Sequence, residues 1–164
     1  MNVINVQELI DRQKTRPLHI LILLLCAAIM TVDGYDLFMV GAIAPTIASY
    51  FHKAPAAMAT VFFVQQVGIA IGSIIMGPIS DRYGRKNILT ICAACFGFLM
   101  IACALSQNLY ELAALRGISG IFLSGVFPIA TTLTSEFAPK KMRARFLSLL
   151  IAGYVAGAAG GGAI

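Results

Sequence analysis

Three ionisable residues, Asp33, Asp36 and Arg116, lie within long apolar stretches of the sequence. An ionised side chain at the centre of a bilayer costs roughly 2.5–3.5 kcal/mol on insertion scales, so such residues either neutralise one another or carry a function. Asp33 and Asp36 are i and i+3, which places both on one face of a helix. Two carboxyl groups that close resist simultaneous ionisation in a low dielectric, and at least one is expected to hold a proton near neutral pH. The pattern favours chemistry in which protons bind and leave.

Arg116 is the residue expected to neutralise an aspartate, because of its depth. At about 1.5 Å of rise per residue, Asp33 lies about 22 Å from the start of its apolar stretch at Leu18, and Arg116 lies about 10 Å from the start of its own at Leu109. In a hydrocarbon layer roughly 30 Å thick, antiparallel helices bring the two to nearly the same depth. The alternative is a purely structural ion pair. We favour proton or substrate handling, since two acids exceed what one arginine needs.

The composition requires helices that cross a membrane. Hydrophobic residues make up 59% of the 164-residue chain and charged residues 12%, and the mean hydropathy is +0.87. Charged residues make up roughly 25% of soluble domains, so a soluble globular domain is excluded, and disorder is excluded because disordered chains are poor in hydrophobic residues. Strands of alternating polarity, typical of membrane barrels, are absent from the sequence. The sequence therefore predicts an all-α integral membrane protein.

Five apolar stretches are long enough to cross the bilayer, which takes about 20 residues of helix. They cover approximately residues 18–49, 56–79, 88–105, 109–137 and 146 to the end of the sequence. We therefore expect an N-terminal segment at 1–17 and a transmembrane domain at 18–164, with the fifth span incomplete at Ile164.

The basic residues predict the orientation. Those expected on one side of the membrane are Arg12, Lys14, Arg16, Arg82, Arg85, Lys86, Lys140, Lys141, Arg143 and Arg145, whereas the other side has only Lys53. Because Lys and Arg are enriched in cytoplasmic loops, the N-terminus and segment 1–17 are predicted to be cytoplasmic, in a multi-pass protein of the cell (inner) membrane. The net charge of +5 thus indicates loops that orient a membrane protein, and no nucleic-acid partner is expected.

The connection between the second and third spans carries the pattern G-x-x-x-D-R-x-G-R-K over residues 77–86. Gly84 permits a sharp turn, and Asp81 can pair with an arginine. Glu136 lies about 30 Å along the fourth helix from Arg116, at the cytoplasmic end, where it can reach Arg85 or Arg145. A structural or gating ion pair is the expected role of Glu136.

No enzyme, metal or cofactor is expected, because neither a nucleophile–base set nor a metal-ligand cluster occurs in the sequence. The Cys92-x-x-Cys95 pair has no histidine or second cysteine pair near it and is interpreted as packing.

These motifs resemble those of the major facilitator superfamily. The pattern at 77–86 is similar to its loop motif, and Arg116 followed by Gly117, Gly120 and Gly125 resembles its fourth-helix motif. The sequence Asp33-Gly34-Tyr35-Asp36 is similar to that of its aromatic acid:proton symporters, as is the end of the fourth span at 127–139.

The resemblance implies a symporter that imports a benzoate-like anion with protons by alternating access. Spans one and four would line a central cavity, in which Asp33 and Asp36 carry the proton and Arg116 either is neutralised by an aspartate or holds the substrate carboxylate. The cytoplasmic gate would comprise Gly77, Asp81, Arg82, Gly84, Arg85 and Lys86, with Glu136 as an ion-pair partner.

Two features differ from the family pattern. Gly117 stands where relatives more often have a bulky apolar residue. The tail at 153–162 resembles part of the glycine-rich fifth-helix motif of proton antiporters but lacks its Gly-Pro pair, which weakens an exporter interpretation.

Three alternatives remain open: a drug-type exporter, a proton-coupled carrier of another organic anion or a sugar, and a non-transporting membrane fragment. The superfamily has twelve spans in two halves, each built from two three-helix inverted repeats. Four spans and part of a fifth would make an N-terminal helical bundle truncated in its fifth transmembrane helix. The lipid bilayer and the missing C-terminal half are then expected partners, and we expect residues 1–164 alone not to transport.

Overall fold

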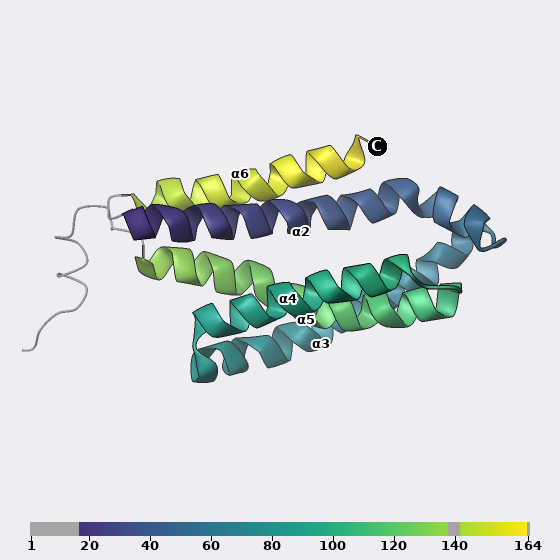
Figure 1. Ribbon diagram of the computed structural model, residues 1–164, viewed down its shortest axis with the longest axis horizontal. Helices are drawn as coiled ribbons and strands as arrows, with labels where there is room; N and C mark the ends of the chain where they lie inside the picture. Colours follow the sequence, from purple (N-terminus) through teal and green to yellow (C-terminus); the bar gives the residue numbers. More distant parts are fainter. Residues whose placement is uncertain (1–16, 138–141, 164) are drawn as a thin grey trace, which may run out of the picture.

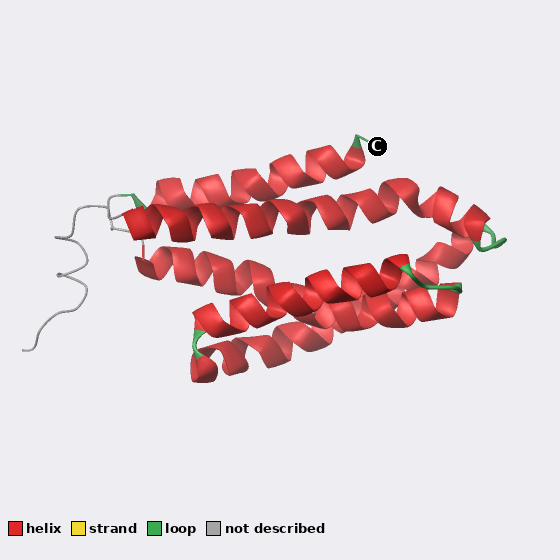
Figure 2. Ribbon diagram, in the orientation of Figure 1, coloured by secondary structure: helices red, strands yellow, loops and turns green. Residues whose placement is uncertain are grey.

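The computed structural model describes residues 17–137 and 142–163, and every regular element in this part of the chain is helical (Figure 2). The long helices are α2 (Pro17–Tyr50), α3 (Met58–Tyr83), α4 (Arg85–Ala104), α5 (Leu109–Phe137) and α6 (Arg143–Gly162), and the short 3₁₀ helix η1 (Pro55–Ala57) precedes α3. Each long helix is apolar and long enough to cross a membrane. The predicted all-α membrane fold is confirmed. Residues 1–16, with most of the predicted N-terminal segment, lie outside the described residues, as do 138–141 with Lys140 and Lys141.

The helices run back and forth, so that successive connections lie at opposite ends of the bundle (Figure 1). The start of α2, the α3–α4 turn and the start of α6 lie toward one end, and the α2–α3 and α4–α5 connections lie toward the other. The α3–α4 turn consists of one residue, Gly84, with φ 91°. A side chain is strained at this backbone angle, so glycine is what allows two long helices to reverse direction in a single residue.

The bundle contains two closely packed helix pairs, and the first is α2 with α6. The contact face of α6 carries Gly153, Gly157 and Gly161, spaced four residues apart so that they align along one face. A methyl group at Gly157 would overlap the backbone carbonyl of Thr31, and one at Gly161 would lie 2.9 Å from the amide nitrogen of Met39. The glycine-rich stretch thus brings two backbones into direct contact, the usual role of such spacing in membranes.

The second close pair is α3 with α5, and glycines again allow the two backbones to approach closely. A methyl group at Gly68 would overlap the carbonyl of Gly117, and one at Gly117 would lie 2.7 Å from Cγ1 of Val64. The departure from the family pattern at Gly117 therefore has a local cause, because a bulky residue there would force α3 and α5 apart.

We predict that Gly157→Ala destabilises the bundle by about 1–3 kcal/mol, the usual cost of overpacking a well-packed contact. The matched control is Gly162→Ala in the same helix, where an added methyl group meets nothing within 4 Å. Thermal unfolding in detergent should show a lower midpoint for Gly157→Ala and no loss for Gly162→Ala. Equal midpoints for the two variants would show that the glycine contact does not hold α2 against α6.

Two clusters of buried side chains fill the space between the pairs. One joins α2, α4, α5 and α6 around Met30, Cys92 and Leu150, and the other joins α2, α3, α4 and α5 around Ala48, Met58 and Val61. Cys92 contacts the Met76 sulfur at 3.9 Å and Cys26 is buried in the same cluster. Cys26, Cys92 and Cys103 are thus core residues, Cys95 is partly exposed, and none of these four described cysteines forms a disulfide.

Candidate functional site

A bidentate ion pair joins α2 to α5 in the interior of the bundle. The Arg116 guanidinium donates from Nη1 to Oδ2 of Asp36 at 2.7 Å and from Nη2 to Oδ1 at 3.1 Å. Both residues are 4% exposed. Fork-to-fork geometry of this kind is the strongest form of arginine–carboxylate pairing, and it satisfies two charges that would each be costly alone. The pair therefore holds α2 against α5, the two helices that carry the predicted intramembrane charges.

The depth estimate from the sequence pointed to Asp33, whereas the structure pairs Arg116 with Asp36, about one turn further along α2. The two aspartates differ by about 4.5 Å in height and by about 60° around the helix axis. The rotation of α2, set by its glycine contacts with α6, is what turns Asp36 toward α5.

Asp33 lies in a different environment. Its side chain is 8% exposed, and no hydrogen bond or salt bridge joins it to any residue within 17–137 or 142–163. It borders a cavity of about 370 Å³ between α2, α4 and α5 whose other lining residues are apolar, among them Phe96, Met100 and Val126. Asp36 thus has a full counter-charge, whereas Asp33 has none among the described residues, although the two share one helix.

A second charged cluster lies at the end of the bundle that holds the α3–α4 turn. Arg85 donates from Nη2 and Nε to Oδ1 of Asp81, at 2.9 and 3.2 Å, and also pairs with Glu136. Arg85 therefore links the end of α3, the start of α4 and the end of α5. Of the two partners that the sequence offered for Glu136, the structure selects Arg85.

The other residues of the predicted gate surround this cluster. The charge cluster lines a pocket of about 470 Å³, which Gly84 and Lys86 also border. The Arg82 guanidinium lies 5.8 Å from the centre of the Tyr83 ring. Gly77 lies in α3, where an added methyl group would meet nothing within 4 Å. The motif thus positions one turn, one three-residue charge cluster and two further cations at a single end of the bundle.

If the gate predicted from the sequence exists, Glu136→Gln should slow the predicted uptake several-fold while leaving the unfolding midpoint nearly unchanged. The pair with Arg85 is exposed, and exposed ion pairs add little to stability. The matched control is Glu111→Gln at the other end of α5, which keeps an acceptor for the amide of Gln107. Initial rates of uptake should fall for Glu136→Gln alone. Equal rates in both variants would remove Glu136 from the proposed gate.

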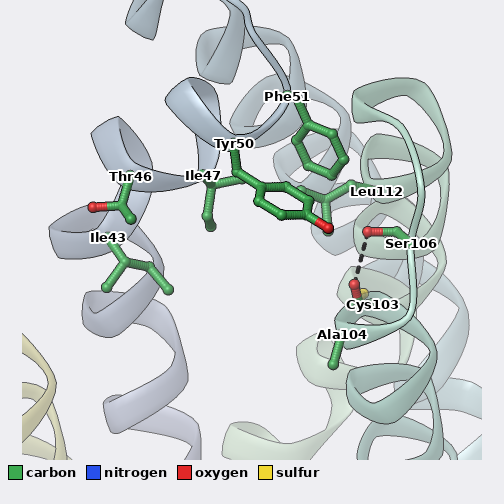
Figure 3. A pocket seen from close by; sticks show the side chains of 9 residues that line it. All are labelled: Ile43, Thr46, Ile47, Tyr50, Phe51, Cys103, Ala104, Ser106 and Leu112. Atoms are coloured by element: carbon green, nitrogen blue, oxygen red, sulfur yellow. Dashed lines mark hydrogen bonds between the residues drawn. The ribbon is translucent and has the colours of Figure 1, made fainter.

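A further pocket, which no sequence pattern predicted, lies at the opposite end of the bundle (Figure 3). It has a volume of about 430 Å³, and no charged side chain lines it. The Tyr50 and Phe51 rings meet edge to face beside it, with centres 5.2 Å apart, and Ser106 Oγ donates to the Cys103 carbonyl at 2.8 Å. Aromatic residues at a span end are typical of a membrane–water interface.

No group of three metal-ligating side chains occurs among the described residues. The candidate site consists instead of charges inside an apolar helical bundle, with a charge cluster at one end. Such an arrangement defines a multi-pass membrane protein that holds ionisable groups at membrane depth.

The family is shown by comparison with known proteins. The profile of the Major Facilitator Superfamily matches residues 9–164, and the chain belongs to this superfamily. Its members are transporters, in agreement with the prediction that the chain is not an enzyme.

Among its relatives, the chain is 38% identical to a gallate transporter of Pseudomonas putida, an alignment that covers 97% of this chain and 35% of the relative. It is 35% identical to a 4-hydroxybenzoate transporter of Pseudomonas aeruginosa, over 97% of this chain and 36% of the relative. It is 30% identical to a benzoate transport protein of Acinetobacter baylyi, over 94% and 34%. The chain therefore spans about a third of the length of the curated relatives it matches.

Proposed function

We propose that the protein containing this chain is a proton-coupled symporter that imports a small aromatic carboxylate by alternating access. The observation that carries the proposal is the contrast between the two aspartates of α2. Asp36 is neutralised by Arg116, whereas Asp33 is buried beside an apolar cavity with no partner in the described part of the chain. A carboxyl group without a counter-charge in such a place is costly when ionised, and binding a proton removes that cost.

Arg116 is the proposed binding group for the substrate carboxylate. A guanidinium binds any carboxylate in the two-bond geometry that Asp36 now provides. When a substrate carboxylate takes this place, Asp36 is left without a counter-charge and takes up a proton. Release of the substrate returns Arg116 to Asp36, which then loses its proton. Anion binding and proton binding are coupled in this way because the two carboxylates compete for one cation.

The cytoplasmic charge cluster is the proposed gate. Arg85, Asp81 and Glu136 hold the ends of three helices together. Exposed ion pairs of this kind are weak enough to break and re-form during a transport cycle. We place these residues in the cytoplasm because the described basic residues Arg82, Arg85, Lys86, Arg143 and Arg145 all belong to one end of the bundle, which also fits a protein of the inner membrane.

The substrate class is proposed from the relatives together with the site. Three relatives are named for gallate, 4-hydroxybenzoate and benzoate, which share a planar ring and a carboxylate. The buried arginine suits the carboxylate that they have in common. A drug-type exporter or a carrier of another organic anion or a sugar would share the fold, and the direction of transport and a competition panel separate these from the proposal.

The experiment is uptake of labelled 4-hydroxybenzoate by cells that express the protein in the full length its gene encodes, with and without an imposed inward proton gradient. We expect accumulation that needs the gradient and that benzoate inhibits, while sugars have no effect. Efflux driven by the gradient, or inhibition by sugars alone, would contradict the proposal.

A further inference from the structure

One aromatic contact in the bundle belongs neither to the Arg116–Asp36 pair, which we call the charge centre, nor to the proposed gate. Phe127 of α5 and Tyr154 of α6 meet edge to face, with ring centres 5.9 Å apart and an angle of 84° between the ring planes. The backbones of α5 and α6 make few close contacts, and this ring pair joins the two helices together with the buried cluster around Leu150. Phe127 is 41% exposed, so its side chain is only partly covered by the described helices.

Phe127 lies on the same face of α5 as Arg116. It comes eleven residues later, which is about three turns and within about 20° of the same direction around the axis. The rise is about 16 Å, toward the end of the helix that carries Glu136. The ring is therefore reached from the charge centre by moving along one face of one helix toward the proposed cytoplasmic gate.

Tyr154, the other member of the ring pair, lies close to the segment of α2 that carries the aspartates. A methyl group at Gly34 would overlap the Tyr154 carbonyl, and Gly34 directly follows Asp33. The Tyr154 ring points from α6 toward α5, and it lies next to the glycine face of α6 that contacts α2. Its side chain also leans toward the N-terminal end of α6, because helical side chains tilt that way. The ring pair thus lies between the charge centre and the gate.

The aromatic pair is separate from the Asp33 cavity. That cavity lies between α2, α4 and α5 and is bordered on α5 by Leu123 and Val126, whereas Phe127 contacts α6. One side of α5 therefore borders the Asp33 cavity with apolar side chains, and another side contacts α6 through the Phe127 ring.

We propose that Phe127 and Tyr154 form the subsite that binds the ring of the transported carboxylate, on the cytoplasmic side of the Arg116–Asp36 pair. This inference rests on the proposed function and adds to it the residues that select an aromatic ring over a saturated one. Ring–ring contacts are favourable in offset or edge-to-face geometry beyond the area that they bury. A saturated ring of the same size and charge keeps the carboxylate contact and loses the aromatic one.

The test uses inhibition of labelled 4-hydroxybenzoate uptake by benzoate and by cyclohexanecarboxylate, which differ in aromaticity and share one carboxylate. In the unaltered protein benzoate should inhibit more strongly. In Phe127→Leu we expect the KM for 4-hydroxybenzoate to rise about 3- to 10-fold with the maximal rate maintained, in line with the known strength of ring–ring contacts. The preference for benzoate over cyclohexanecarboxylate should shrink by a similar factor.

Two further variants separate recognition from folding. Tyr154→Phe keeps the ring and should retain the preference, whereas Tyr154→Leu should reduce it. Phe98→Leu removes an aromatic ring from α4 that is 73% exposed, and it should change neither KM nor preference. Protein abundance in the membrane fraction is measured for each variant, so that uptake is expressed per molecule.

The outcomes distinguish the inference from the proposed function. If the unaltered protein takes up no aromatic carboxylate, the proposed function and this inference both fail. If it does so, and Phe127→Leu and Tyr154→Leu keep the preference for benzoate, the inference alone is wrong.

Discussion

Asp36→Asn is expected to destabilise the protein by about 3–5 kcal/mol, the usual effect of removing one partner of a buried ion pair. The change leaves the Arg116 guanidinium ionised, 4% exposed and without its carboxylate. Arginine cannot escape this by losing a proton, since its side chain stays protonated in proteins. The expected observation is a strong fall in the unfolding midpoint in detergent, together with loss of uptake.

The double variant Asp36→Asn/Arg116→Gln is the control for this prediction. It removes both charges and leaves two neutral amide side chains in their place. We therefore expect it to be more stable than Asp36→Asn alone, even though it carries one more substitution. A double-mutant cycle on the midpoints gives the coupling between the two side chains. Strictly additive effects, or a loss below about 1 kcal/mol for Asp36→Asn, would show that the pair is not a buried, coupled one.

Asp33→Asn is expected to abolish accumulation driven by a proton gradient without destabilising the fold. Asp33 has no partner to lose in the described part of the chain, and the asparagine amide removes a group that is costly in an apolar cavity when ionised. The unfolding midpoint should therefore be unchanged or higher. Exchange of labelled for unlabelled substrate across the membrane should persist, because exchange does not require net movement of protons.

The comparison of accumulation with exchange is decisive for Asp33. A transporter that has lost only one of its two proton-carrying aspartates still exchanges substrate, whereas a misfolded one neither accumulates nor exchanges it. Loss of both activities together with a lower midpoint would assign Asp33 a structural role. Full accumulation in Asp33→Asn would remove it from proton coupling.

The helices were predictable from the sequence because apolar stretches of membrane length are almost independent of tertiary structure. The fourth stretch, 109–137, coincides with α5, and the first, 18–49, differs from α2 by one residue at each end. The third differed more, since it was placed at 88–105 and α4 begins at Arg85. Charged residues at its start hid the helix, which begins directly after Gly84.

The pairing of the helices was not predictable in the same way. Glycines spaced as in α6 are typical of close helix packing, but the spacing alone does not say which helix they contact. The contact with α2 depends on the matching surface around Ala27, Thr31 and Tyr35, which carries no distinctive sequence pattern. The same limit explains why depth indicated Asp33 and the structure selects Asp36.

The charges themselves were evident from the sequence because ionised residues are rare inside membranes. The ring pair of Phe127 and Tyr154 was not, since phenylalanine and tyrosine are common in apolar helices. The available indication was the spacing of eleven residues between Arg116 and Phe127, which repeats one helix face.

Accumulation of labelled 4-hydroxybenzoate tests the proposed proton chemistry most directly. It is measured in vesicles that contain the protein in the full length its gene encodes, under an imposed inward proton gradient. The unaltered protein, Asp33→Asn and Asp36→Asn are compared at equal abundance. We predict accumulation above the outside concentration for the unaltered protein and none for either variant. Accumulation that persists in both variants would contradict the proposed proton chemistry of α2.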